Sequence, residues 1–209
     1  MSEEYDEREG PHLTKARLEA LSDGIFAFAM TLLVISINLP DKATLVQSNA
    51  FALHTLISLY SAFYHYVLAF LILAAFWVSQ HIQFHSVRTP DKIFIWINLI
   101  TLMFVALLPF STSFNGSFTN VPVAAMVFQA NLFALGMGMS CQWWYATRHH
   151  RLAEPSLNPS YIRRMTAHNL IVPAVSLFCI LVALTGITWS SIFYLTLPPI
   201  EYIVQRIYG

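Results

Sequence analysis

An aspartate stands at the start of the first long apolar stretch of the chain. Asp23 follows Ser22 and precedes residues 24–40, which carry no charge, and Arg17 lies between one and two helical turns upstream. An ionisable group inside a bilayer costs roughly 2.5–3.5 kcal/mol on insertion scales, and by default it marks a functional site. A helix cap, or a polar network that ties this helix to its neighbours, explains the same residues without a direct role in transport. Both interpretations stay open at the level of sequence.

His81 and His85 are the histidines whose spacing could support chemistry, because residues four apart share one face of a helix. Two ligands are too few for a closed zinc site, and the two cysteines show no CxxC spacing. We therefore expect no metal site, and we expect His81 to hydrogen-bond with Asp23 or Asn98. The sequence also lacks a nucleophile–base pair, an HExxH motif and a phosphate-binding loop, so an enzyme is not expected.

The sequence around these residues is unusually apolar. Hydrophobic residues make up 56% of the 209 residues and charged residues only 11%, whereas a soluble domain carries about 25% charge. The net charge of zero gives no reason to expect a nucleic-acid partner. Charges are absent from residues 43–87, 93–147 and 165–200. Because a spanning helix needs about 20 mostly apolar residues, the sequence predicts an all-α integral membrane protein.

Six transmembrane helices fit into these stretches. Residues 93–147 are too many for one helix, and we expect a break that begins at residues 114–117, where Asn, Gly and Ser follow one another, and that continues through Asn120 to Pro122. The last helix is the weakest, because Pro198 and Pro199 interrupt it. The predicted helices cover about residues 20–39, 54–82, 93–113, 122–146, 164–185 and 188–206. Together they form one membrane domain, residues 17–207, after an N-terminal tail of residues 1–16.

The basic residues predict the orientation of this domain. Cytoplasmic loops carry an excess of Lys and Arg. With six spans, ten of the eleven basic residues fall on one side and only Lys42 falls on the other, whereas five or seven spans would mix the two groups. We therefore expect both termini in the cytoplasm, and the basic connection 148–161 near anionic lipid headgroups.

One face of the first helix carries a regular apolar stripe. Phe28, Leu32, Ile35 and Leu39 follow one another at helical spacing, and Thr31 lies beside them. Such periodicity does not say whether the face meets lipid, protein or water. Packing or lipid contact is the simpler interpretation, and a pore lining is the functional one.

The polar residues that precede this stripe have a recognisable order. Arg17 is followed after three residues by Leu21, Ser22 and Asp23, and Thr31 comes eight residues after the aspartate. This order resembles the signature of the transmembrane protein 175 family, the endolysosomal and prokaryotic potassium channels. The family has Phe-Ser-Asp at this point, so Leu21 is an exchange between apolar side chains.

The resemblance continues as far as about residue 112. Trp77 and His81 match the Trp-x-x-His-His motif that ends the second helix of the family, and Asn98 with residues 107–110 matches its Asn…Leu-Pro-Phe pattern. Gln80 replaces the first histidine of that motif. A glutamine can hydrogen-bond but cannot titrate, so any family role of that histidine is in question here.

The resemblance implies a six-helix channel of the prokaryotic form, located in a prokaryotic cell membrane. It implies a homotetramer around four copies of the first helix, permeable to potassium and other monovalent cations, with no cofactor besides the permeant ions. The pore positions of the family fall on Phe28, Thr31, Leu32 and Ile35, with the constriction at Phe28. The family has an aliphatic residue at the constriction, so the bulkier Phe28 would need ring rotation or helix tilt to conduct. The sequence contains no TVGYG-like filter, so rings of apolar side chains would form the gate and selectivity should be modest.

A carrier is the alternative to a channel. Asp23 and His81 could relay protons and so couple proton movement to that of a small solute or a cation. Carriers of this kind usually show broken helices or paired repeats, and neither is clear in the sequence. Unitary current steps in a reconstituted bilayer would indicate a channel, and slow saturating flux a carrier.

Overall fold

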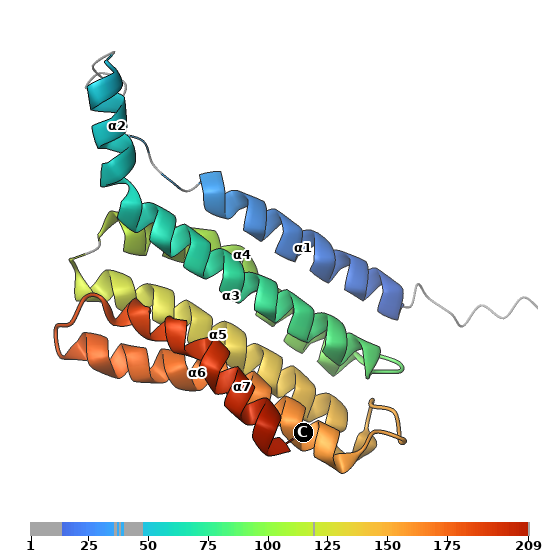
Figure 1. Ribbon diagram of the computed structural model, residues 1–209. Coiled ribbons are helices and arrows are strands. Elements are labelled where there is room, and N and C mark those ends of the chain that lie inside the picture. Colours follow the sequence, from blue (N-terminus) through green and yellow to red (C-terminus); the bar gives the residue numbers. More distant parts are fainter. Residues whose placement is uncertain (1–13, 36, 38, 40–47, 119, 209) are drawn as a thin grey trace, which may run out of the picture.

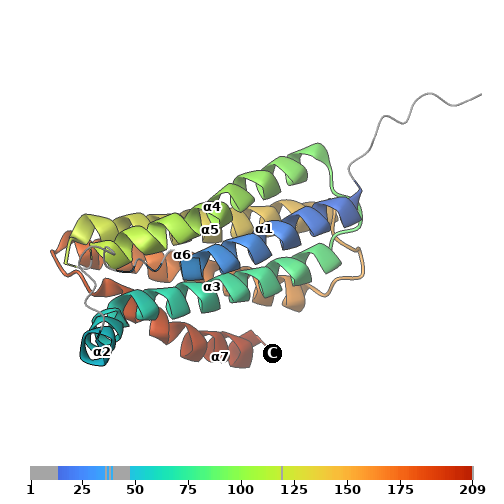
Figure 2. The same cartoon turned by 90° about the horizontal axis from the view of Figure 1, so that it is seen from above.

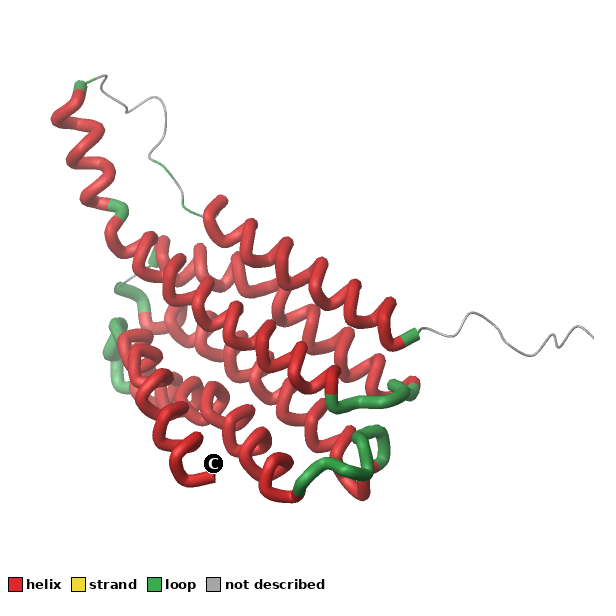
Figure 3. Tube along the Cα trace, turned by 45° about the vertical axis from the view of Figure 1, so that its right-hand side comes forward, coloured by secondary structure: helices red, strands yellow, loops and turns green. Residues whose placement is uncertain are grey.

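The computed structural model describes residues 14–35, 37, 39, 48–118 and 120–208, and these residues form a bundle of helices joined by short connections (Figures 1 and 3). The elements are α1 (Lys15–Ile35), α2 (Asn49–Ser58), α3 (Tyr60–His85), α4 (Lys92–Ser117), α5 (Pro122–Thr147), η2 (Arg148–His150), α6 (Pro159–Leu184), η3 (Ser190–Thr196) and α7 (Leu197–Tyr208). Five of them, α1, α3, α4, α5 and α6, are long and apolar enough to cross a membrane. The chain is therefore an all-helical integral membrane protein.

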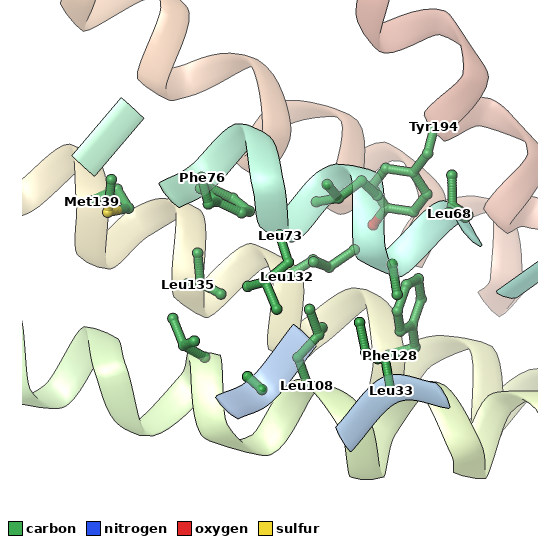
Figure 4. Packing of buried hydrophobic residues seen from close by; sticks show 14 of the residues in the cluster. Leu33, Leu68, Leu73, Phe76, Leu108, Phe128, Leu132, Leu135, Met139 and Tyr194 are labelled. Atoms are coloured by element: carbon green, nitrogen blue, oxygen red, sulfur yellow. The ribbon is translucent and has the colours of Figure 1, made fainter. Parts of the chain in front are cut away.

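The bundle places α1 at one side. Helix α1 packs against α3 and α4, α5 lies between α4 and α6, and η3 and α7 pack on α6. The two views of the ribbon agree that α1 and α6 lie on opposite sides of the bundle (Figures 1 and 2). The core between them is apolar, and side chains from α1, α3, α4, α5 and η3 meet there (Figure 4); it includes Leu33, Leu73, Leu108, Phe128, Leu132 and Tyr194.

Three of the predicted helices have different boundaries in the structure. The predicted helix 54–82 is divided at Leu59 into α2 and α3, and the Ser58 hydroxyl donates to the Thr55 carbonyl at 2.7 Å just before the break. Such bonds compete with the helical ladder and often bend helices. The helix predicted to end at residue 113 continues to Ser117 as α4, whereas α5 begins at Pro122 as predicted, at a proline that cannot continue a preceding helix. The first helix starts earlier than predicted, at Lys15, and part of its predicted end lies outside the described residues.

The last predicted helix consists of two pieces. A 3₁₀ helix of seven residues, η3, leads directly into the 12 residues of α7. At about 2.0 and 1.5 Å per residue their combined length is roughly 32 Å, close to the hydrocarbon thickness of about 30 Å. Pro198 and Pro199 lie in the first turn of α7, where backbone N–H groups have no helical partner in any case. The prolines therefore begin a helix and do not interrupt one.

Close contacts fix the position of α5. A Cβ atom at Gly136 would lie 2.6 Å from Cδ of Pro173 on α6, and one at Gly138 would collide with the Thr101 side chain on α4. Small residues let helix backbones approach closely in membranes. The two glycines thus let α5 lie close to α4 and α6. This close packing sets the position of the polar residues of α5.

Candidate pore face and its supporting network

Helix α1 has one packed face and one open face. The packed face contains the residues that are buried against α3 and α4: Leu18, Ser22, Phe26, Ala29 and Leu33. Their spacing of three or four residues follows the helical repeat. The opposite face is exposed, and it contains Ala20, Gly24, Ala27, Thr31 and Ile35. Within one subunit, nothing described covers this second face.

The predicted pore positions lie on or beside the open face. Phe28 is 65% exposed, Ile35 is 72% exposed, and Thr31 is exposed as well. Leu32 is half-buried, so it lies at the edge of the open face towards the packed side. The Thr31 hydroxyl donates to the Phe28 carbonyl at 2.7 Å. Because the proton is used within the helix, the lone pairs of the Thr31 oxygen stay available as acceptors.

Asn98 is the centre of a buried network that joins four helices. Its side-chain nitrogen donates to the Ser22 hydroxyl of α1 at 3.1 Å. Its oxygen accepts from Gln80 of α3 at 2.7 Å and from Gln142 of α5 at 3.4 Å. The Ser22 hydroxyl in turn donates to the Leu18 carbonyl at 2.9 Å. All four side chains are at most 3% exposed, so water cannot replace these bonds.

Gln142 was not found by the sequence analysis. It lies in a long apolar run, and its distance from Asn98 along the chain gives no sign of contact. A buried amide in a spanning helix is nevertheless a signal, since polar side chains inside a membrane usually face the bundle interior and have partners. Gln80, the residue that replaces the family histidine, also takes part in this network.

Asp23 has a different partner from the expected one. The indole nitrogen of Trp77 donates to its carboxylate at 2.8 Å, and both side chains are exposed. The rings of Trp77 and His81 lie 6.2 Å apart, but the structure shows no hydrogen bond between His81 and Asp23 in the described part of the chain. Trp77 lies one turn before His81 on α3, at the level of Asp23.

The start of α1 is held by Lys15 and not by Arg17. The Lys15 ammonium group donates to the Val87 carbonyl at 2.8 Å, and it lies 3.8 Å from the Glu19 carboxylate. The Arg17 side chain is exposed and forms no hydrogen bond or ion pair with another described residue. The same part of the chain contains no group of three residues that could hold a metal ion.

Comparison with known proteins identifies the family. A family model described as the endosomal/lysosomal potassium channel TMEM175 matches residues 17–109, the segment that contains the open face, Asp23 and Asn98. A potassium channel of Streptomyces collinus is 31% identical over 146 residues, which cover 68% of this chain and 69% of that protein. A potassium channel of Chamaesiphon minutus is 27% identical over 179 residues, which cover 84% and 87%. The chain belongs to the TMEM175 family of ion channels, and it is not an enzyme.

Solved structures show the same fold. The crystal structure of a lysosomal potassium-selective channel TMEM175 homologue from Chamaesiphon minutus superposes with a TM-score of 0.74 at 23% identity, over 93% of this chain and 98% of that one.

The human endosomal/lysosomal proton channel TMEM175 is 28% identical over 179 residues, but the match covers only 34% of its length. The bacterial relatives are named for potassium, and the human relative is named for protons.

Proposed function

We propose that this protein is a potassium-permeable cation channel whose pore is lined by α1 from four copies of the chain. The observation that carries the proposal is the open face of α1, which lies opposite its packed face and bears Phe28, Thr31 and Ile35. Membership of a channel family supports a role for this face beyond lipid contact. The bacterial relatives named as potassium channels support the choice of ion.

The open face of α1 suits close association between copies. Ala20, Gly24 and Ala27 are exposed, and a Cβ atom at Gly24 would meet nothing within 4 Å. Small residues allow membrane helices to approach closely without a hydrophobic driving force. Four copies related by a cyclic axis would bury this face and bring four Phe28 side chains together. A homotetramer is therefore the assembly that we propose.

We further propose six spans, with both termini in the cytoplasm of a prokaryotic cell. The start of α1 and the connections α3–α4 and α5–α6 lie at one end of the bundle, and the C-terminal end of α7 points towards it (Figure 1). The Arg88 backbone N–H donates to the Leu152 carbonyl, which joins two of the predicted cytoplasmic connections. Cysteine labelling should reach position 151 only from inside and position 120 only from outside. Labelling of position 151 from outside intact cells would contradict the six-span arrangement.

Conduction would depend on a hydrophobic constriction. A narrow ring of four Phe28 side chains cannot hold a continuous column of water, so ions would meet a barrier of dehydration there. The Thr31 oxygens lie next to this ring on the helix surface, with lone pairs available because their protons are bonded to the Phe28 carbonyls. Four such oxygens would form a weak site for a partly dehydrated cation. No backbone-carbonyl filter is needed in this arrangement.

The carrier alternative receives less support from the structure. A proton relay between Asp23 and His81 requires hydrogen-bond contact, whereas the contact that Asp23 makes is with the Trp77 indole, a donor that does not titrate. His81 is exposed beside Trp77, and no hydrogen bond joins it to the Asn98 network in the described part of the chain. The family relatives named as channels point the same way.

Single-channel recording of the purified protein in a planar bilayer tests the proposal. We expect unitary current steps, with potassium favoured over sodium, and Phe28→Asn should increase the current. Phe178→Asn is the matched control, because Phe178 is 51% exposed on α6, away from the open face of α1. Recording under a proton gradient separates proton from potassium current, which matters because the human relative is named a proton channel. Slow saturating flux without unitary steps would refute the channel.

A further inference from the structure

Two cavities meet at the end of the bundle where α5 leads into η2. The first is an apolar groove of about 220 Å³ between α5 and α6, lined by residues that include Met137, Cys141, Trp144 and Leu170. The second is a basic cavity of about 460 Å³, lined by Trp144, Tyr145, Arg148, His149 and Arg151. Trp144 lines both cavities, so they lie next to one another at this side chain. We propose that they form one binding site for an anionic phospholipid, with the phosphate in the basic cavity and an acyl chain in the apolar groove.

The basic cavity has the features of a phosphate site. The guanidinium carbon of Arg148 lies 4.8 Å from the Trp144 ring centre, and that of Arg151 lies 4.8 Å from the Tyr145 ring centre. Stacking on an aromatic ring orients the planar guanidinium group, whose N–H donors match a phosphate. Arg148 forms no ion pair with a carboxylate in the described part of the chain.

The Asp91 carboxylate orients Arg151 and does not cancel the positive charge of the cavity. Its Nε atom lies 3.6 Å from the carboxylate of Asp91, and 56% of its side chain is exposed. Asp91 also accepts a hydrogen bond from the Tyr145 hydroxyl at 2.6 Å and from the Phe94 backbone N–H at 2.9 Å. With Arg148 and Arg151 against a single carboxylate, the cavity keeps an excess of positive charge.

The backbone around the cavity is held in an unusual conformation. His149 and His150 have φ values of 55° and 50°, in the left-handed region that residues other than glycine seldom adopt. The N–H groups of Leu152 and Ala153 both donate to the Ala146 carbonyl at 3.1 Å, and this closes the turn. Strained backbone persists where the surrounding structure holds it, and it is common at binding sites. The turn stops α5 and keeps Arg148 and Arg151 beside the groove.

The apolar groove explains why the ligand is a lipid and not a free phosphate. The lining of the groove on α5 runs from Met137 to Trp144, seven residues apart, so the groove extends roughly 10 Å along α5, about a third of the hydrocarbon thickness. Trp144 lies between the two cavities, at the level where aromatic side chains meet lipid headgroups. A phosphate anion would fill only the basic part. Since α1 and α6 lie on opposite sides of the bundle (Figure 1), the groove stays open to the bilayer when α1 faces a pore.

Native mass spectrometry of the purified protein in neutral detergent tests this site. Phosphatidylglycerol should bind more tightly than phosphatidylcholine with the same acyl chains. Arg148→Gln and Arg151→Gln should each lower the affinity for phosphatidylglycerol roughly fivefold, and both together about twentyfold, because each basic residue near a membrane contributes a similar share. Cys141→Trp, which fills the groove and leaves the charge unchanged, should also weaken binding.

Matched variants control for charge and for bulk. Arg163→Gln with Arg164→Gln removes two arginines from the start of α6 that line neither cavity, and Leu177→Trp adds an indole to an exposed position outside the groove. Neither should change the affinity. Equal loss in the Arg163/Arg164 variant, equal binding of phosphatidylcholine, or displacement of the lipid by an equal concentration of glycerol 3-phosphate would each overturn the proposal. Arg148→Gln is the variant least able to disturb folding, since its side chain is exposed.

Discussion

The two halves of α1 are held to the bundle by different forces. The first half, up to Gly24, forms directional bonds: Lys15 to the Val87 carbonyl, Ser22 to Asn98, and Asp23 to Trp77. In the second half the buried side chains are all apolar, and they are Phe26, Ala29 and Leu33. The residues of the proposed pore lining lie in this second half.

This difference separates an anchor from a gate. The anchor is the first half of α1 with the Asn98 network, and the gate is the second half of α1 with Phe28. Hydrogen bonds fix both the position and the rotation of a helix, because they weaken steeply when their angle changes. Apolar contact is non-directional and depends mainly on the area removed from water or lipid. The contacts of the buried apolar side chains therefore allow the second half of α1 to rotate or tilt slightly, and that is the motion that a ring of Phe28 side chains would need in order to open.

The largest expected effect comes from removing the centre of the anchor. Asn98→Ala would leave Ser22, Gln80 and Gln142 buried without their present partner, and each such loss costs about 1–3 kcal/mol. We expect a loss of roughly 3–5 kcal/mol in stability, or no assembled protein at all. Thermal unfolding followed by size-exclusion chromatography measures it. Asn120→Ala, at an exposed position in the α4–α5 connection, is the control and should unfold like the unaltered protein.

Substitution in the gate should have the opposite profile, with a large effect on current and a small one on stability. Phe28→Ala removes exposed bulk from the open face and should wet the constriction, so the unitary current rises several-fold and the preference for potassium over sodium falls. Planar-bilayer recording measures both quantities. If Phe28→Ala changes neither while Ile35→Ala changes both, the constriction lies deeper in the helix.

Sequence and structure agree best for α1 and its signature. The order of Arg17, Ser22, Asp23 and Thr31 led to the family, because these residues are close together in the chain. The partners of these residues could not be derived in the same way. Trp77, and not His81, bonds to Asp23 because of the relative height of two helices, which depends on packing along their whole length.

The second half of the chain shows where sequence reasoning ends. Gln142 and Gly138 lie in one apolar run. The Gln142 side chain nevertheless joins the Asn98 network, whereas Gly138 lets α4 approach closely. The start of the break between α4 and α5 was predicted four residues too early, because Gly and Asn are tolerated in the last turn of a helix, where fewer backbone bonds depend on them. The prolines at 198 and 199 lie directly after the change from η3 to α7, because the first turn of a helix accepts proline readily.

A smaller change at the gate concerns ion preference alone. Thr31→Val keeps the shape of the side chain and removes the hydroxyl oxygen, so the preference for potassium over sodium should change about two- to threefold while the current stays similar. Reversal potentials in mixed potassium and sodium solutions measure this ratio. Thr31→Ser, which keeps the oxygen, should behave like the unaltered protein. A Thr31→Ser variant as altered as Thr31→Val would assign the effect to packing and not to the oxygen.

The smallest expected effect concerns the outer bond of the anchor. Trp77→Phe removes the donor to Asp23 and keeps an aromatic ring beside His81. Because both partners are exposed, solvent can replace part of the bond, and we expect a loss of no more than about 1 kcal/mol. A double-mutant cycle of Trp77→Phe with Asp23→Asn measures the interaction itself, since each single change also affects other contacts.

A coupling near zero would mean that the bond contributes nothing to stability, and that the buried Asn98 network alone fixes the first half of α1. A coupling as large as the effect of Asn98→Ala would contradict the separation of a strong inner anchor from a weak outer one. His81→Gln serves as the matched change on α3, and it should leave the coupling unaltered because His81 has no hydrogen bond to Trp77 or Asp23 in the described part of the chain.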